Sequence, residues 1–354
     1  MTKTECIFID PRSNILYSSY YIQGLFEVFG KKNVKFSSVF FNDLIKRKDD
    51  YSYDSYMAFV ILNGDVIKKV VVDFGDNWPI RENAYGWCDV YAKINYNPER
   101  TALQFKDKIL PIPPGFGIKI WNVFEALKYS FLNLIILKFK PQISLKKYIF
   151  SYLSQFKQIP LRLITKNVKN SPAAGNYVFF ISSLWKDPNC LTGTNLYRKM
   201  FVESCLRNNV NFDGGFWAND RSHPQFDEFK EITFTKRYPL RQYVQKTKQS
   251  ALVFNTPAVH NCHGWKLGQY LAMNKAIIST PFQNSLSIDL VHGENIHYVK
   301  NKQELDAGLN KILHDDNYRK KLEKGAATYY LKNCAPHTII VHISQKLNLK
   351  IDYE

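Results

Sequence analysis

The chain has 354 residues and a formal net charge of +17, because 48 Lys and Arg residues outnumber 31 Asp and Glu residues. Hydrophobic residues make up 45% of the chain and aromatic residues 15%, which excludes an intrinsically disordered protein, and the length predicts two domains with substantial cores. The positive charge indicates an anionic partner, which could be a nucleic acid, an acidic membrane or a phosphorylated substrate.

The bulk sequence also indicates a compartment. The cysteines are spread along the chain without a CxxC pair, which favours free thiols in a reducing compartment over a zinc site. No basic segment followed by a long apolar run occurs at the N-terminus, so no signal peptide is predicted. The longest apolar run, 131–137, is far shorter than the ~20 residues that span a bilayer. We therefore expect a cytoplasmic protein that could also rest on the inner face of the plasma membrane.

The first part of the chain predicts an α/β domain. A strand, a helix and an extended run follow one another, as in the opening of a βαβ unit. A hairpin is then signalled by Asn63-Gly64 between two apolar runs, so a mixed sheet is predicted rather than a purely parallel one. The strands are predicted at 6–10, 34–41, 57–62, 66–74 and 89–94, and the helix at 20–29.

Two apolar stretches of helical length follow, at 118–137 and 143–156. Lysines and aromatic residues are interleaved along them, and Glu125 is the only acidic residue between Lys119 and Arg162. Large apolar residues beside lysines suit helices that lie at an anionic headgroup layer. The same pattern also fits helices that pack on a sheet and keep their lysines solvated, and both interpretations stay open.

A polar stretch at 166–175 is the best candidate for a linker, and a second α/β pattern follows it. Strands that alternate with helices at this spacing predict a doubly wound sheet. The last helix, at 338–349, could cross back to the first domain. Strands are predicted at 177–181, 210–212, 251–254, 276–279 and 295–299, and helices at 193–207, 240–248, 265–273, 303–313 and 317–333.

The segment after the strand at 251–254 carries the strongest chemical signal. A loop with His263 and Gly264 leads into a helix with Lys266 and Gln269 near its start. Ligands of α/β sheets bind beyond the carboxyl ends of strands, and helix N-termini favour anions. Lys266 would add a full charge where a phosphate rests, and Gln269 shares its face of the helix. The alternative is that the histidine caps the helix and Lys266 is solvated.

Two motifs here resemble those of the GT-B glycosyltransferases, particularly the large group 1 or family 4-like class that uses nucleotide sugars in polysaccharide assembly. The stretch QYLAMNKAIIST at 269–280 resembles that class's "EAMA-x-GKPVIAS", and HGENIHYV at 292–299 resembles "HGENG-x-x-V". The helical ending with DDNYRKKLEKGA is also similar. The resemblance covers about residues 176–335.

The resemblance implies a GT-B fold, in which two Rossmann-like domains face a central cleft and the second binds a nucleotide-sugar donor. Lys186 matches the basic residue that pairs with the donor diphosphate. Gln269 stands where the family has its second glutamate, which bonds ribose hydroxyls, and Asn261 stands where it has the first. The donor-binding residues implied for this chain are Lys186, His263, Gly264, Lys266, Gln269 and Glu294.

A catalytic base would deprotonate the acceptor hydroxyl in an inverting enzyme. Asp10 and Asp76 follow strands of the first domain and are the candidates, although Asp at a strand end is also a common turn former. Phosphate binding by lysines and helix ends requires no metal, and no cofactor is expected. The chain contains no DxD, P-loop or GxGxxG motif, which disfavours a metal-dependent glycosyltransferase fold, an NTPase and a dehydrogenase.

We therefore predict a metal-independent, hexosyltransferase-like enzyme that moves a sugar from a nucleotide-sugar donor to a glycan or lipid-linked glycan acceptor. Its pathway would be surface polysaccharide biosynthesis, such as that of capsule or O-antigen. One alternative is a nucleotide-sugar epimerase of the same fold, which would need carboxylates in its cleft. The other is a non-enzymatic basic protein that binds a membrane or nucleic acid. Nucleic acid is the least expected partner, because the second half also carries acidic residues.

The predicted domains follow from the linker and the two α/β patterns. An acceptor-binding Rossmann-like domain is expected at 1–168, with the basic aromatic helices at 116–157. A nucleotide-sugar-binding Rossmann-like domain is expected at 172–337. Residues 338–354 would form a helix that returns to the first domain.

Overall fold

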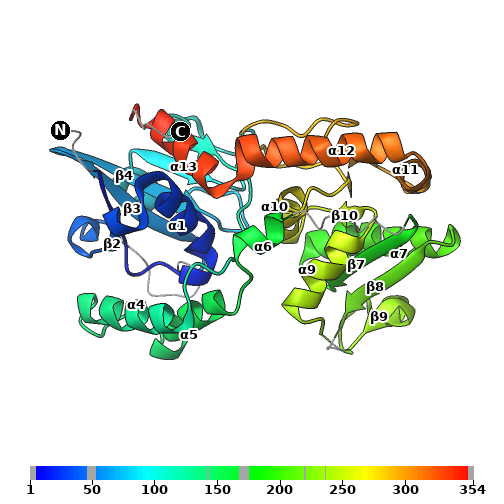
Figure 1. The fold of residues 1–354 in the computed structure, drawn as a ribbon, viewed down its shortest axis with the longest axis horizontal. Coiled ribbons are helices and arrows are strands. Elements are labelled where there is room, and N and C mark those ends of the chain that lie inside the picture. Colours follow the sequence, from blue (N-terminus) through cyan, green and yellow to red (C-terminus); the bar gives the residue numbers. More distant parts are fainter. Residues whose placement is uncertain are drawn as a thin grey trace. The chain divides into compact units, whose positions relative to one another are not determined.

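The computed structural model describes residues 5–45, 53–141, 143–166, 175–218, 221–235 and 237–349. The chain divides into two compact units (Figure 1). Unit 1 comprises 1–161, 285–287 and 332–354, and unit 2 comprises 162–284 and 288–331.

This division differs in detail from the predicted domains. Residues 332–337 and 285–287 belong to unit 1, although the prediction placed both in the second domain. The boundary after the first unit falls at Leu161, before the predicted linker. Most of that linker, 167–174, lies outside the described residues.

Unit 1 is built on a six-stranded sheet in the order β2-β1-β3-β4-β5-β6. β3 runs antiparallel to both of its neighbours, β1 and β4, whereas β1–β2, β4–β5 and β5–β6 pair in parallel. The predicted mixed sheet is therefore confirmed. Its strands are β1 Cys6–Ile9, β2 Val34–Phe36, β3 Tyr56–Asn63, β4 Val66–Asp73, β5 Val90–Lys93 and β6 Ile109–Pro111.

The predicted hairpin is present, one residue later than expected. Asn63 pairs with Val66 in the last register position, so the loop consists of Gly64 and Asp65. Gly64 has a φ of 60°, a conformation that glycine adopts without steric cost. The extended run predicted at 34–41 was wrong in its second half, because Val39–Phe41 forms a 3-10 turn.

Helices that come from both ends of the chain pack together in unit 1. α1 (Ile15–Phe29) begins where the Asn14 side chain accepts from the backbone of Leu16 and Tyr17, earlier than the predicted start at residue 20. α13 (Pro336–Lys346) lies against α1. A Cβ on Gly24 would lie 2.3 Å from the carbonyl oxygen of Pro336, so the close approach requires glycine.

Two further helices, α4 (Val123–Ile136) and α5 (Leu145–Phe156), pack side by side, and α5 also contacts α1. α4 begins at residue 123 rather than at the predicted 118, because Asn122 and Glu125 form a reciprocal capping box. No helix in the described part of the chain is long and apolar enough to cross a membrane. α3 (Glu82–Trp87) and β6 were not predicted.

Unit 2 contains two three-stranded parallel sheets, ordered β9-β8-β7 and β10-β11-β12. The backbone N–H of Ala251, just before β10, donates to the carbonyl of Tyr177 in β7 at 2.7 Å, so these two edges are neighbours. The combined order is the one found in doubly wound Rossmann folds. The strands are β7 Tyr177–Ser183, β8 Asn211–Trp217, β9 Thr233–Phe234, β10 Val253–Asn255, β11 Ile277–Ser279 and β12 His297–Tyr298.

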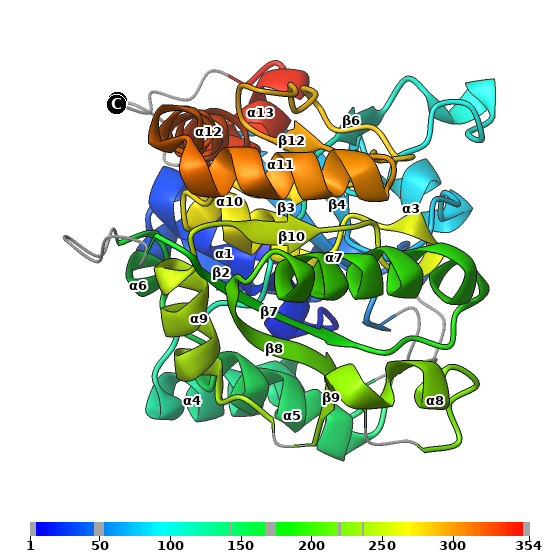
Figure 2. The same ribbon diagram turned by 90° about the vertical axis from the view of Figure 1, so that its right-hand side faces the viewer.

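Helices cover these strands, with α7 and α11 in front of them in Figure 2. A core of aliphatic residues and phenylalanines joins the layers, and the rings of Phe201 and Phe254 stack at 4.4 Å between centroids. The helices are α6 Leu161–Thr165 at the boundary between the units, α7 Asn195–Arg207, α8 Phe226–Phe229, α9 Leu240–Gln249, α10 Trp265–Ala272, α11 Lys302–His314 and α12 Asp316–Tyr329. π-helical turns precede α7 at Cys190–Thr194 and follow α12 at Tyr330–Cys334.

The predicted α/β class is confirmed in both units, and most predicted elements of unit 2 occur at the expected places. The main difference is β8, which extends to Trp217 beyond the predicted 210–212. Gly214 and Gly215 interrupt its apolar pattern and have φ values of 119° and 133°. A Cβ on Gly214 would lie 1.9 Å from the carbonyl oxygen of Phe180, so β8 can pair with β7 only through glycine here.

Candidate functional site

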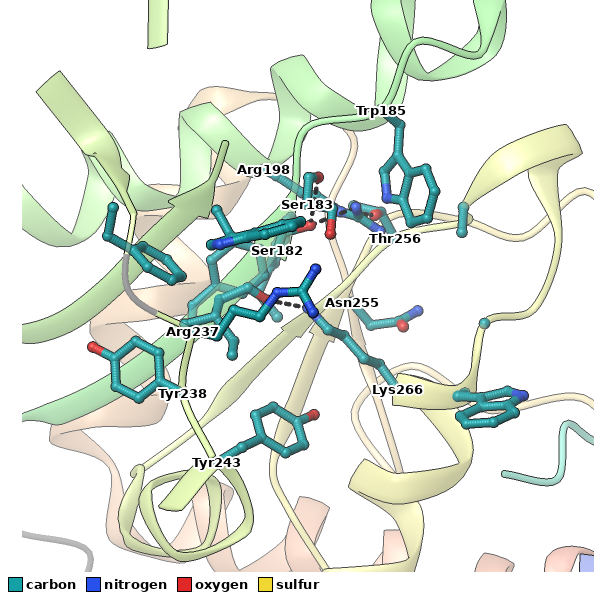
Figure 3. Close-up of a pocket in the computed structure, with 18 residues that line it drawn as sticks. Ser182, Ser183, Trp185, Arg198, Arg237, Tyr238, Tyr243, Asn255, Thr256 and Lys266 are labelled. Atoms are coloured by element: carbon teal, nitrogen blue, oxygen red, sulfur yellow. Dashed lines mark hydrogen bonds between the residues drawn. The ribbon is translucent and has the colours of Figure 1, made fainter. Parts of the chain in front are cut away.

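A pocket of about 450 Å³ lies in unit 2, where the carboxyl ends of β7 and β10 meet (Figure 3). The chain runs outward from β7 to β9, then returns to β10 and runs outward in the other direction, so the pocket lies at a topological switch point. Ligands of open α/β sheets bind at this position. It is lined by Phe180, Ile181, Ser182, Ser183, Trp185, Arg198, Trp217, Phe234, Arg237, Tyr238, Tyr243, Phe254, Asn255, Thr256, Ala258, Gly264, Trp265 and Lys266.

The walls of the pocket are aromatic and its charges have one sign. Three basic residues, Arg198, Arg237 and Lys266, line it, and the described lining residues include no aspartate or glutamate. Hydroxyl and amide groups come from the strand ends, including Ser182 and Thr256. A pocket of this kind favours a ligand that combines negative charge with a flat or apolar part.

Arg198 on α7 is 6% exposed, and its guanidinium contacts neutral groups. Its Nε donates to the Thr256 hydroxyl at 2.9 Å and Nη1 donates to the Ser182 hydroxyl at 2.7 Å. Burial lowers the pKa of Arg198 to about 10. A buried guanidinium whose partners among the described residues are hydroxyls lacks the compensating charge that buried cations normally have.

Lys266 in the first turn of α10 is the second cation of the pocket, and its side chain is half-buried. Its Nζ donates to the carbonyl of Ile181 at the end of β7 and lies 5.0 Å from the ring centroid of Phe180. Burial lowers the pKa of the Lys266 amine well below its usual value, and the nearby charge of Arg198 lowers it further. The first backbone N–H groups of α10 have no partner within the helix and add partial positive charge at the helix end that carries Lys266.

Arg237 adds a third, exposed cation at the pocket. Its guanidinium carbon lies 4.2 Å from the ring centroid of Trp217, so the two side chains stack. Tyr238 follows Arg237 and donates to Asp213 of β8 at 2.9 Å, which fixes this segment against the sheet. The stacked pair places a planar apolar surface beside the positive charges.

Of the residues predicted to bind a donor, Gly264 and Lys266 line the pocket. Gln269 lies behind the wall, where its Oε1 accepts from the hydroxyl of Tyr243, a lining residue, at 3.1 Å. The structure thus brings three of the predicted residues to one place through α10.

The other predicted donor residues lie outside the lining of the pocket. His263 is buried, with Nε2 at 3.1 Å from the carbonyl oxygen of Asn284 and its ring against Phe282. Lys186 is exposed and follows the lining residue Trp185. Glu294 is exposed.

Asp10 and Asp76, the predicted catalytic bases, belong to unit 1. Asp10 is fully buried, and its carboxylate accepts from the Nε and the backbone N–H of Arg12, each at 2.9 Å. This pairing gives Asp10 a structural role in the turn after β1. Asp76 is exposed after β4. Their catalytic role stays a prediction.

Arg198, Trp217 and Arg237 were not predicted as site residues. Arg198 lies within a helix that has other basic residues, and only the packing of α7 shows that this one is buried. Trp217 was missed because β8 was predicted to end five residues too early, at 212 rather than 217. Ser182 could have been found, since it directly follows the predicted strand 177–181, whereas Thr256 is separated from the predicted strand 251–254 by Asn255.

No family model and no curated protein sequence matches the chain. Among solved structures, the chain is similar to TarM, with 10% identity, a TM-score of 0.45, and coverage of 78% of this chain and 48% of that one. HepE of Anabaena in complex with UDP-glucose has 13% identity and a TM-score of 0.43, and the match covers 75% of this chain and 65% of that one. A glycosyltransferase from Rickettsia africae has 12% identity and a TM-score of 0.39, and the match covers 74% of this chain and 78% of that one. The chain thus spans about half the length of the first structure and 65% of the second. Likenesses at this level assign neither an activity nor a ligand to the chain.

Proposed function

We propose that the pocket of unit 2 binds the diphosphate of a nucleotide sugar and that the protein is a glycosyltransferase of the GT-B type. The observation that carries the proposal is a pair of cations, the buried Arg198 and the half-buried Lys266, at the β7–β10 switch point, in a pocket whose described lining residues include no carboxylate. An anionic ligand would supply the negative charge that balances these two cations.

A nucleoside diphosphate fits the chemistry of this pocket in both of its parts. The diphosphate would accept from the Lys266 amine and from Arg198, with the hydroxyls of Ser182 and Thr256 beside them. The nucleoside would lie on the aromatic surface that Trp217 and Arg237 form.

The same cations would assist the transfer step. As the bond between the anomeric carbon and the diphosphate oxygen breaks, negative charge grows on the leaving diphosphate. Fixed cations in a desolvated site stabilise such growing charge and need no rearrangement when it appears. We infer that Arg198 and Lys266 provide this stabilisation, so that the proposed reaction does not depend on a divalent metal.

The motifs of the sequence support the same reaction class. The stretch 269–280 follows Lys266 on α10 and continues into β11, and 292–299 leads into β12. We propose that unit 1 binds the acceptor, a glycan or lipid-linked glycan of a surface polysaccharide, and that a hexose is transferred. An epimerase of the same fold is the alternative, and analysis of the reaction products distinguishes the two.

Nucleotide binding to the purified chain tests the proposal. We expect isothermal titration calorimetry to detect binding of at least one among UDP, GDP, ADP and CDP, and much weaker binding of the matching nucleoside. Lys266→Met should weaken diphosphate binding by about tenfold to a hundredfold, the loss typical of a charge-assisted hydrogen bond. Lys324→Met, which changes an exposed lysine on α12, serves as the matched control.

Two results would overturn the assignment. One is that none of the four diphosphates binds. The other is that Lys266→Met binds as tightly as the unchanged protein while its thermal unfolding shows an intact fold. If a diphosphate binds, incubation with the matching nucleotide sugars and product analysis by NMR spectroscopy would identify the donor. Transfer of the sugar to an added acceptor indicates a transferase, whereas a sugar of changed configuration, free or bound to the nucleotide, indicates an epimerase.

A further inference from the structure

Helix α4 of unit 1 has its apolar face turned outward. Phe124 is 80% exposed and Phe131 is 56% exposed, and Leu127 and Ile135 are also exposed. These positions recur at the three- and four-residue intervals that form one stripe along a helix. Large apolar side chains in such a stripe normally face the core, so this stripe requires a partner.

The buried face of α4 explains why the helix is oriented this way. It carries small and polar residues, among them Ser130 and Asn133. The Asn133 amide donates to the Tyr152 hydroxyl of α5 at 2.9 Å, and that hydroxyl lies 3.0 Å from the hydroxyl of Tyr148. This satisfied polar layer fixes which side of α4 faces the unit. The exposed apolar stripe is therefore a consequence of the fold.

The segment after α4 extends the stripe. Lys138 and Phe139 have φ values of 51° and 55°, a left-handed conformation that costs non-glycine residues energy. Phe139 is 62% exposed, and its ring lies 6.3 Å from that of Phe131. Two phenylalanines thus form an exposed edge at the end of the helix, and Phe150 of α5 is also exposed.

The charges around this apolar surface are positive. Exposed lysines are present on α4, at Lys128, and in the segment that follows the helix, at Lys138 and Lys140. The one acidic residue of α4, Glu125, is held by Lys31 at 2.6 Å. The surface therefore combines exposed phenylalanines with lysines whose charge is not balanced by a carboxylate of α4.

We propose that this surface, defined by the exposed residues of α4, its following loop and α5, docks the protein on an anionic lipid bilayer. The phenylalanines would enter the boundary between headgroups and acyl chains, and the lysines would contact lipid phosphates. A second copy of the chain is a poorer occupant, because a two-fold pairing of this face would bring like charges together. The proposal does not depend on the ligand of the pocket in unit 2.

Vesicle co-sedimentation of the full chain tests the proposal. We expect binding to phosphatidylcholine vesicles that contain phosphatidylglycerol and much weaker binding to phosphatidylcholine alone. Binding should fall as salt is raised, because the lysine contribution is screened. Phe124→Ser and Phe131→Ser should each reduce the partition constant by about tenfold, and together by about a hundredfold. Replacing Lys128, Lys138 and Lys140 by glutamine should remove the preference for anionic lipid.

Leu103→Ser is the control, because Leu103 is 79% exposed in unit 1 but lies outside this surface. It should bind vesicles like the unchanged protein. Thermal unfolding and light scattering of each variant separate a loss of docking from misfolding or a change in oligomeric state. The proposal fails if the folded protein does not bind vesicles that contain anionic lipid. It also fails if the phenylalanine variants bind vesicles as well as the control does. A third contradicting outcome is that the unchanged protein forms a stable dimer, does not bind vesicles, and loses the dimer in the phenylalanine variants.

Discussion

The half-buried amine of Lys266 would couple the proposed ligand binding to proton uptake. In the empty pocket, burial and Arg198 lower the pKa of Lys266, so that part of the population is neutral below the usual lysine pKa. A bound diphosphate would raise that pKa again, because an opposite charge stabilises the protonated amine. Binding therefore takes up a proton at pH values between the pKa of the empty pocket and that of the occupied pocket.

We expect the affinity for a nucleoside diphosphate to rise as the pH falls through that interval, because lower pH favours the state that binds the extra proton. Calorimetry in buffers of different ionisation enthalpy measures the number of protons taken up. In Lys266→Met the uptake should fall to the amount that the phosphate itself takes up, so this variant also measures that contribution. Equal proton uptake in both proteins would show that another group is responsible.

His297 of β12 makes a different, purely structural prediction about pH. Burial lowers its pKa to about 4, and His292 and Lys311 add unfavourable charge. Its Nδ1 lies 2.7 Å from the Tyr318 hydroxyl, which can donate to the neutral ring. Between pH 6.5 and about 4 the unfolded chain binds a proton that the folded chain does not. The free energy of unfolding therefore falls as the pH falls through this range.

His297→Asn keeps an acceptor for Tyr318 and removes the titration. We expect the difference in unfolding free energy between the two proteins to change by on the order of 2 kcal/mol between pH 6.5 and 4, after allowance for solvent screening. Urea unfolding at a series of pH values measures it. A difference that is constant with pH would contradict the assignment of this proton to His297.

At the scale of elements, the contact between α11 and β12 depends on a glycine. A Cβ on Gly308 would lie 2.5 Å from Nε2 of His297. Glycine to alanine inside a helix ordinarily stabilises by about 1 kcal/mol. Here the added methyl group would force the buried ring to move, at a cost of about 1–3 kcal/mol, so Gly308→Ala is expected to destabilise.

Gly86 in α3 is the matched control, because a Cβ there meets no atom within 4 Å. Gly86→Ala should leave stability unchanged or raise it by up to about 1 kcal/mol. Urea unfolding of the two variants should therefore give changes of opposite sign. If Gly308→Ala is as stable as Gly86→Ala, the packing of His297 against α11 is looser than the structure shows.

Local signals predicted the elements well where they act over a few residues. The glycine turn at residue 64 and the strand–loop–helix order around Lys266 were both visible in the sequence. Helix starts were less accurate, because the Asn14 and Asn122 caps compete with apolar periodicity as start signals. The predicted strand 210–212 ends before Gly214 and Gly215, a pair of residues typical of a turn, whereas pairing with β7 keeps both glycines in β8.

At the scale of the whole molecule, the limit of sequence reasoning was burial. Periodicity shows that α4 is amphipathic, but the polar layer around Tyr152 decides which face is covered. The same holds for Arg198, whose burial depends on how α7 packs on strands that are distant in sequence. Charged residues that long-range packing buries are the ones that local patterns cannot identify.

The closeness of α1 and α13 has a consequence for synthesis. Every residue of unit 2 is added between the main part of unit 1 and α13, so the ribosome completes unit 2 before it delivers the helix that packs on Gly24. Unit 2 can fold as it emerges. The surface of α1 that α13 covers stays open for the whole of that time. Unit 1 therefore cannot complete this pair of helices until synthesis of unit 2 has finished.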